Sequence, residues 1–318
     1  MTCISSISLS LLALLSATGL TADLVTIENS WLRVSVDPLG AELQSIRHIN
    51  TDTEYLWQGD PDYWDNRAPV MFPVNVRFKD NQFSYRGKRY EMPRMGLAVI
   101  SEFETFLSED GEAVTLSLAA NEMTRAHYPF EFVFDVTYRL KGNRLVNEYR
   151  VSNNGSETLY FAMGGHPGFR TPFNKGRSRG DYEISFSKRL NLDRVEINDS
   201  LIETSRVPFL RDERKFTLDD PRIPSGGMFQ EDMPARKIGV GLEDMLPYVT
   251  GDLGDFPNVN IWTPPGMPFV CIEPMVAHHD IQDSPLAIDK KPFLIPVKAG
   301  EAKTYAFSII VTHNGDLD

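Results

Sequence analysis

Glu273 is a lone carboxylate inside an apolar, strand-like run, residues 269–274, that ends in proline. Burial disfavours the charged form of a carboxyl group, so such a position raises the pKa of a glutamate and makes it a better proton acceptor. The alternative is a buried ion pair with an arginine such as Arg77 or Arg139, because a buried charge needs a partner to offset its desolvation. The first interpretation predicts a general base.

His166 is the second side chain suited to proton transfer. It follows Gly164 and Gly165 and precedes Pro167, so we expect an approachable imidazole on a fixed backbone. Histidine exchanges protons near neutral pH and is a natural general acid. The alternative is a histidine that caps a turn at the end of a strand. A base and an acid suffice for a reaction without a redox step, so we expect neither a metal nor a cofactor.

The composition is that of an ordinary globular protein, with 42% hydrophobic and 24% charged residues among 318. The formal net charge of -12 argues against nucleic acid as a partner, because phosphate backbones are bound by clustered Lys and Arg. A neutral or cationic small molecule fits this charge better. The sequence leaves the oligomeric state open.

Short alternating or β-branched runs, separated by turn residues, recur along the chain, and helical periodicity is scarce. The clearest runs are residues 31–36, 113–118, 131–140, 144–151, 159–163 and 305–312. Strands without alternating helices exclude a parallel α/β sheet and predict an all-β fold, a large antiparallel sandwich. No segment resembles a linker between domains, so we expect a single domain in which residues 219–234 form a long loop.

The N-terminus predicts a signal peptide over residues 1–22, because an apolar, serine-rich stretch at 4–20 is followed by small residues. This stretch is too short for a comfortable membrane span. We therefore expect residues 23–318 to form the mature domain, periplasmic or secreted and free of the membrane. No Lys or Arg precedes the stretch, so the alternative is a cytoplasmic protein that starts near Leu24.

Seven segments stand in the order seen in aldose 1-epimerases. They are residues 26–29, 37–46, 55–61, 68–73, 164–169, 261–263 and 271–274. By these motifs the chain resembles the galactose-mutarotase superfamily over nearly its whole mature length. The resemblance implies a large antiparallel β-sandwich of the galactose-mutarotase type, with a free hexose bound in a cleft across one concave sheet.

The resemblance also implies a role for each candidate residue. Glu273 would take the proton of the anomeric hydroxyl while His166 protonates the ring oxygen. The ring then opens, its C1–C2 bond rotates, and closure on the other face gives the other anomer. Arg77 matches an arginine expected to bind sugar hydroxyls.

Five aromatic residues are candidates for a surface on which a pyranose ring could stack. They are Trp57, Tyr63, Trp64, Phe169 and Trp262. Trp57 and Trp262 lie in strand-like runs, so we expect them in the core. Phe169 follows His166 closely, and we expect it to contact the substrate.

Residues 95–99 depart from the family pattern, since relatives carry His-Gly-Phe-Ala-Arg and this chain has Met-Gly-Leu-Ala-Val. Met95 removes a hydrogen-bond donor and Val99 removes a charge. One interpretation is a drifted but active enzyme, or one with an altered sugar preference. The other is a catalytically weakened carbohydrate-binding member of the family.

His278 and His279 stand where relatives carry a glycine and an apolar residue. Adjacent residues on a strand point to opposite faces, so the two histidines make a poor metal pair. Either they lie in an exposed loop, or one of them reaches the site and replaces the donor lost at Met95. We count His279 with Arg77 and Phe169 as expected sugar-binding residues.

Overall fold

The computed structural model describes residues 23–312, and strands dominate this part of the chain. Three antiparallel strands come first: β1 (Val25–Glu28), β2 (Leu32–Asp37) and β3 (Glu42–His48). Two small two-stranded sheets pair β5 (Gln82–Tyr85) with β6 (Lys88–Glu91), and β11 (Leu159–Phe161) with β21 (Ile295–Val297). The described residues include one α-helix, α1 (Glu122–His127), whose N-terminus is capped by Asn121.

The largest sheet has fifteen strands in the order β4-β12-β20-β19-β16-β14-β17-β18-β22-β10-β9-β8-β7, with β13 on β20 and β15 on β14. Its members are β4 (Val70–Met71), β7 (Glu104–Leu107), β8 (Ala113–Ala119), β9 (Phe132–Lys141), β10 (Arg144–Asn153), β12 (Met163–Gly165), β13 (Gly168–Arg170), β14 (Tyr182–Asn198), β15 (Leu201–Thr217), β16 (Met228–Gln230), β17 (Lys237–Leu242), β18 (Val249–Asp252), β19 (Asn258–Trp262), β20 (Phe269–Val276) and β22 (Ala302–Val311). Neighbouring strands in it are antiparallel. The predicted all-β, antiparallel sandwich is confirmed.

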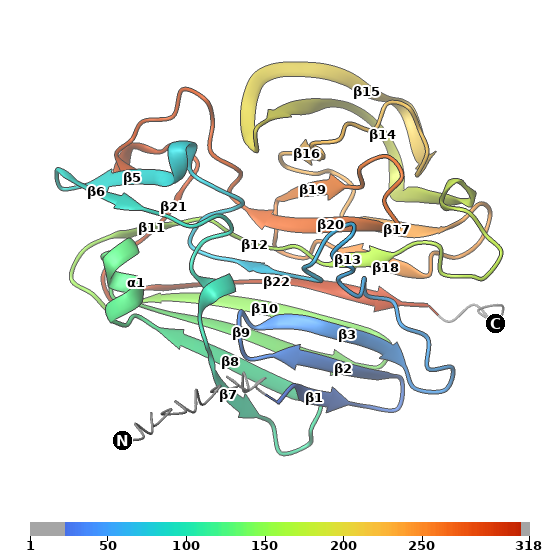
Figure 1. The fold of residues 1–318 in the computed structure, drawn as a ribbon, viewed down its shortest axis with the longest axis horizontal. Coiled ribbons are helices and arrows are strands. Elements are labelled where there is room, and N and C mark those ends of the chain that lie inside the picture. Colours follow the sequence, from blue (N-terminus) through green and yellow to red (C-terminus); the bar gives the residue numbers. More distant parts are fainter. Residues whose placement is uncertain (1–22, 313–318) are drawn as a thin grey trace, which may run out of the picture.

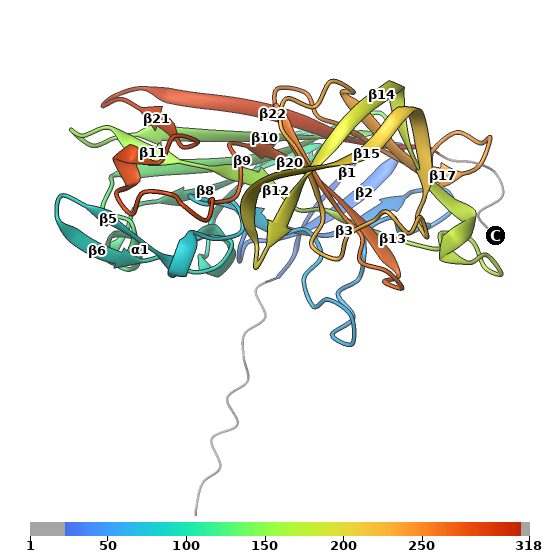
Figure 2. The same cartoon turned by 90° about the horizontal axis from the view of Figure 1, so that it is seen from above.

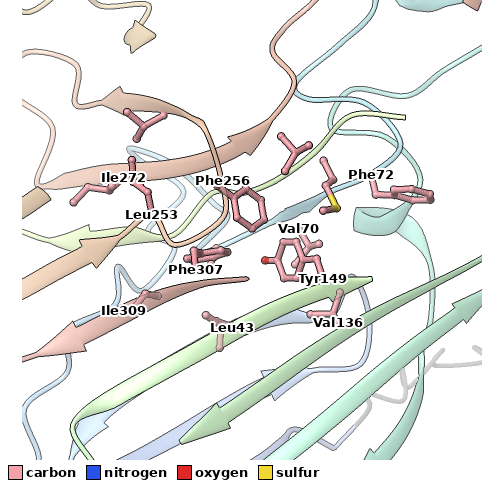
Figure 3. Packing of buried hydrophobic residues seen from close by; sticks show 14 of the residues in the cluster. Leu43, Val70, Phe72, Val136, Tyr149, Leu253, Phe256, Ile272, Phe307 and Ile309 are labelled. Carbon is pink, nitrogen blue, oxygen red and sulfur yellow. The ribbon is translucent and has the colours of Figure 1, made fainter. Parts of the chain in front are cut away.

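The β1–β3 sheet lies over the β8–β10 part of the large sheet (Figure 1), and the Tyr138 hydroxyl on β9 donates to the carbonyl of Ala41. Alternate residues of β9 are buried, as expected for a strand with one face on the core. The aromatic rings of Tyr149, Phe256 and Phe307 meet edge to face in this core (Figure 3). One cluster of buried side chains extends from Ile27 to Val311.

The predicted strand runs correspond to β2, β8, β9, β10, β11 and β22. One large element was missed: β14 and β15 form a long hairpin whose outward positions carry charged residues and whose register shifts several times. Such irregular ladders break the simple alternation that identifies a strand. The expected loop at 219–234 also contains the short strand β16.

The β14–β15 hairpin arches over β16 and β19 (Figure 1), and from above it crosses β20 (Figure 2). Its two-residue turn, Asp199-Ser200, has positive φ angles at both positions, as a tight hairpin turn requires. Next to the turn, the Ile202 amide donates to the carbonyl of Asp280 at 2.8 Å. The tip of the hairpin is thereby fixed to the segment that follows β20.

The predicted signal peptide lies outside the described residues and stays a prediction. Within residues 23–312, none of the helices has the length and apolar character needed to cross a membrane.

Candidate active site

Glu273 lies on β20, which is buried along its whole length, and its side chain is 0% exposed. In the β19–β20 ladder it faces Asn260, whose amide nitrogen donates to Glu273 Oε1 at 2.9 Å. The proposed alternative of an ion pair with arginine is wrong, because Arg77 binds Asp199 and Arg139 is exposed on β9.

His166 lies between β12 and β13, and its backbone amide donates to the carbonyl of Pro69 at 3.0 Å. Its ring packs against those of Trp64 and Trp262, with centroids 5.0 and 5.6 Å away. Nε2 lies 3.5 Å from Glu273 Oε2, and Nδ1 is buried without a hydrogen-bond partner. The predicted acid and base are therefore neighbours.

The two glycines before His166 allow close packing of strands, whereas we expected them to leave space beside the imidazole. A Cβ on Gly165 would lie 2.8 Å from the Phe307 ring, and a Cβ on Gly164 would lie 2.9 Å from the carbonyl oxygen of Pro274. These residues let β12 approach the core and β20 closely. The position of the imidazole thus depends on tight strand packing, not on open space beside the ring.

Burial shifts the pKa values of Glu273 and His166 in the directions that favour the neutral form of each side chain. Desolvation raises the pKa of Glu273 well above its ordinary value, and the hydrogen bond from Asn260 opposes this shift. Desolvation lowers the pKa of His166 to about 4. A protonated Glu273 beside a neutral His166 carries as many protons as a carboxylate beside an imidazolium. Transfer of one proton within the pair therefore yields a base and an acid without exchange with solvent.

Both side chains open onto a cleft of about 560 Å³, which is within the range of small-molecule sites. Its lining comprises Trp64, Val76, Arg94, Met95, His166, Ile197, Asn198, Asp199, Ser200, Ser225, Gly226, Asn260, Trp262, Glu273 and His279. The two indole rings offer apolar faces next to the proton-transfer pair. The lining otherwise mixes polar and apolar side chains, as expected for a ligand with hydroxyl groups on an apolar ring.

Two of the predicted substrate-binding residues are placed differently from expectation. Phe169 is fully buried on β13, where it pairs with Val270 of β20, and it lies outside the cleft lining. Neighbouring strand positions face opposite sides, so closeness to His166 in sequence did not bring its ring into the cleft. The guanidinium of Arg77 is bound to Asp199 at the tip of the hairpin. Asp199 lines the cleft, whereas Arg77 lies behind it and outside the lining.

The aromatic predictions divide as well. Trp57 is buried and packs on Phe269, as expected. Trp262 was expected in the core, but its ring lines the cleft beside Trp64. Tyr63 is half exposed and lies outside the cleft lining.

Residues 278 and 279 do not form an exposed loop. His279 is 2% exposed and lines the cleft, whereas His278 packs its ring on Phe293 with centroids 4.5 Å apart. Met95 also lines the cleft, but Val99 lies on a short 3₁₀ turn against Gly40. The missing donor at position 95 therefore affects the cleft directly, and the missing charge at position 99 does not.

The sequence did not reveal six polar residues of the cleft, which are Arg94, Asn198, Asp199, Ser200, Ser225 and Asn260. Asn260 had a usable signal, since an amide inside the apolar run of β19 needs a partner, as Glu273 does in β20. The residues of the hairpin turn had no such signal. Their place in the cleft depends on how the β14–β15 hairpin packs against other strands, which the local sequence does not specify. Among residues 23–312, no cluster of three or more His, Cys, Asp or Glu is arranged to hold a metal ion.

The chain belongs to the aldose 1-epimerase family, whose sequence model matches residues 23–229. This match includes His166 and ends before Glu273. The chain is thus a member of a carbohydrate epimerase or binding family.

Similar proteins agree with this assignment. The plasmid-encoded protein LacX of Lactococcus lactis subsp. lactis is 29% identical over 265 residues, which are 79% of this chain and 86% of LacX. A galactose mutarotase related enzyme from Lactobacillus acidophilus has a TM-score of 0.86 and 30% identity, over 92% of this chain and 98% of its own. A galactose mutarotase-like protein from Lactobacillus casei has a TM-score of 0.83 and 27% identity, over 91% and 100%.

Proposed function

We propose that the protein is an aldose 1-epimerase that interconverts the α and β anomers of a free, uncharged hexose. The observation that carries the proposal is the distance of 3.5 Å between His166 Nε2 and Glu273 Oε2 at the floor of the cleft. Mutarotation requires proton removal from the anomeric hydroxyl and proton delivery to the ring oxygen. These two oxygens are bonded to the same carbon, so an acid and a base must converge at neighbouring points.

In the proposed mechanism Glu273, as the carboxylate, accepts the proton of the anomeric hydroxyl, and His166, as the imidazolium, protonates the ring oxygen. The C1–O5 bond breaks to give the open-chain aldehyde. Rotation about C1–C2 presents the other face of the carbonyl, and the same two groups return the protons in reverse roles. The proton count of the pair is unchanged over the cycle, which agrees with the absence of a net redox or hydrolytic step.

Charge in the cleft supports an uncharged substrate. Arg77 is engaged by the carboxylate of Asp199, and Arg94 donates to the hydroxyl of Ser200 at 3.0 Å. The carboxylate of Asp199 therefore offsets the positive charge of Arg77, which would otherwise attract an anionic group on the sugar. Trp64 and Trp262 supply apolar faces against which the C–H groups of a pyranose pack.

The second candidate function is a catalytically weakened carbohydrate-binding protein. Met95 favours it, because this thioether faces the cleft and offers no hydrogen-bond donor to the substrate. The cleft and the aromatic faces would remain in use, and turnover would be lost.

Polarimetry or exchange NMR on freshly dissolved α-D-glucose and α-D-galactose separates these two functions. We expect anomer interconversion to be faster than the spontaneous rate, and Glu273→Gln and His166→Ala to abolish the acceleration. No acceleration with any common aldose would exclude the epimerase. Stabilisation of the wild-type protein by sugar without acceleration would support the binding protein.

A further inference from the structure

His279 is a buried imidazole whose nitrogens both lack a partner. The residue lines the cleft together with Glu273, and neither Nδ1 nor Nε2 makes a hydrogen bond. Its ring packs on Phe229 at 5.7 Å between centroids. Buried polar atoms are normally hydrogen-bonded, so a ring of this kind at a cleft wall indicates a ligand that completes its bonding.

Three other side chains of the cleft donate hydrogen bonds within the protein. The Asn260 amide donates to Glu273, the Trp262 indole donates to the carbonyl of Ser225 at 3.1 Å, and Arg94 donates to Ser200. Met95 has no donor to offer. His279 differs from these donors in that neither of its ring nitrogens has a partner within the protein.

The backbone around His279 is held from several directions. The Asn258 amide donates to the carbonyl of Ala277 at 2.7 Å, and the Ile202 amide donates to the carbonyl of Asp280. The ring of His278 makes a hydrogen bond with the carbonyl of His279 itself. Because main-chain groups on both sides are fixed, the imidazole is preorganised to meet a ligand without reordering the segment.

We propose that His279 is a substrate-binding residue that exchanges hydrogen bonds with a sugar hydroxyl beside the Glu273–His166 pair. A hydroxyl both donates and accepts, and a neutral imidazole has one N–H and one lone pair to match it. Burial, together with the nearby His278, His166 and Arg94, lowers the pKa of His279 to about 3, so the ring stays neutral at physiological pH and does not act as the acid. The inference rests on the proposed function in that the ligand is a sugar.

The test measures binding separately from turnover. 1,5-Anhydro-D-glucitol and 1,5-anhydro-D-galactitol lack the anomeric hydroxyl and cannot mutarotate, so their Kd values report binding alone. We expect His279→Phe, which keeps the ring packing on Phe229 but removes both nitrogens, to weaken binding on the order of tenfold. His279→Gln keeps a donor and an acceptor, so it should recover most of that loss. In turnover assays the same variants should raise KM more than they lower kcat.

His278→Asn is the matched control, because its amide nitrogen can keep the hydrogen bond to the carbonyl of His279 and position 278 lies outside the cleft lining. We expect it to leave Kd within about twofold of wild type. Equal weakening by His278→Asn and His279→Phe would overturn the inference, because it would assign the effect to the shape of the segment. Unchanged binding in His279→Phe, or a wild-type protein that binds neither ligand, would overturn it as well.

A spectroscopic measurement gives a second readout that does not depend on the variants. In ¹⁵N-labelled protein the ring nitrogens of His279 should report a neutral imidazole at pH 7 and shift when 1,5-anhydro-D-galactitol or its gluco counterpart is added. Shifts confined to His166 would count against His279. A wild-type protein that binds these ligands but does not speed mutarotation would refute the proposed enzyme and leave the role of His279 standing.

Discussion

Asn260 and Glu273 face each other in the β19–β20 ladder, and the amide nitrogen of Asn260 holds Glu273 Oε1 at 2.9 Å. This hydrogen bond leaves Oε2 as the oxygen that approaches His166 Nε2. Two paired backbones therefore set the direction of the carboxylate, so the base is oriented before a substrate enters. Such preorganisation lowers the cost of reaching the transition state.

Asn260→Ala should move the basic limb of the kcat/KM profile to higher pH. The Asn260 amide stabilises the charged form of Glu273, so its loss raises a pKa that burial has already raised. The Glu273–His166 pair then gives up its shared proton to solvent only at higher pH. The profile should be measured by polarimetry between about pH 5 and pH 9. This range includes the ordinary pKa of histidine and extends well above that of a carboxyl group.

Asn258→Ala is the control for this change. Asn258 is also a buried amide on β19, but it bonds the carbonyl of Ala277 and the amide of Asp232, and it lies outside the cleft lining. We expect a lower Tm and an unshifted basic limb. A shift of equal size in both variants would assign the effect to general damage of β19.

Glu273→Gln should abolish turnover and stabilise the protein. General acid–base catalysis contributes about 10²–10⁴ in rate, so a loss of this order is expected. Above the ordinary carboxyl pKa of 4.5, the folded wild type holds a proton on Glu273 that the unfolded chain releases. Its stability therefore falls as pH rises through the folded pKa, and glutamine is free of this penalty.

The measurement is the Tm of both proteins between about pH 4 and pH 8, a span that begins near the ordinary carboxyl pKa and extends well above it. The Tm advantage of Glu273→Gln should grow with pH. A constant difference would mean that Glu273 titrates alike in the folded and unfolded states. His166 acts on both proteins alike, since its lowered pKa destabilises the fold only toward acid pH, below about 6.5.

Local sequence predicted the strands of regular alternation, and it singled out Glu273 and His166, which the structure places 3.5 Å apart. Each of these two residues is conspicuous in its own segment, as a charge in an apolar run and as a ring between glycines and proline. The side to which a residue points depends on where its strand begins, and for that reason the prediction for Phe169 was wrong. Asn260 and Asp199 depend on register and on a long irregular hairpin, neither of which short-range patterns specify.

Asp199→Asn should make the cleft more tolerant of an anionic sugar. Removing this carboxylate leaves Arg77 without its partner, so the rim gains net positive charge. The ratio of kcat/KM for D-glucose 6-phosphate to that for D-glucose should rise relative to wild type, and the rise should shrink at high salt. Asp199 is 73% exposed, so the Tm should fall only slightly.

Asp193→Asn provides the comparison for that variant. Asp193 pairs with Arg211 on the same hairpin, and neither residue lines the cleft. It should leave the ratio unchanged. If the ratio rises equally in both variants, long-range charge rather than the Arg77–Asp199 pair sets the preference.

Lys291→Met should destabilise the protein strongly, because it leaves a buried charge without its partner. Lys291 Nζ lies 2.5 Å from Asp280 Oδ2 and 2.9 Å from the hydroxyl of Ser284, and both charged side chains are almost fully buried. Breaking a buried ion pair from one side costs about 3–5 kcal/mol. Asp280 directly follows His279, so the pair also anchors the segment that carries the proposed sugar-binding ring.

Urea denaturation of Lys291→Met, Lys290→Met and the double variant Lys291→Met with Asp280→Asn tests this role. Lys290 is the next residue but its side chain is 70% exposed, so its substitution should change the free energy of unfolding by no more than about 0.5 kcal/mol. The double variant removes both charges and should recover part of the loss. Equal stability of Lys290→Met and Lys291→Met would show that the Lys291–Asp280 pair does not stabilise the fold.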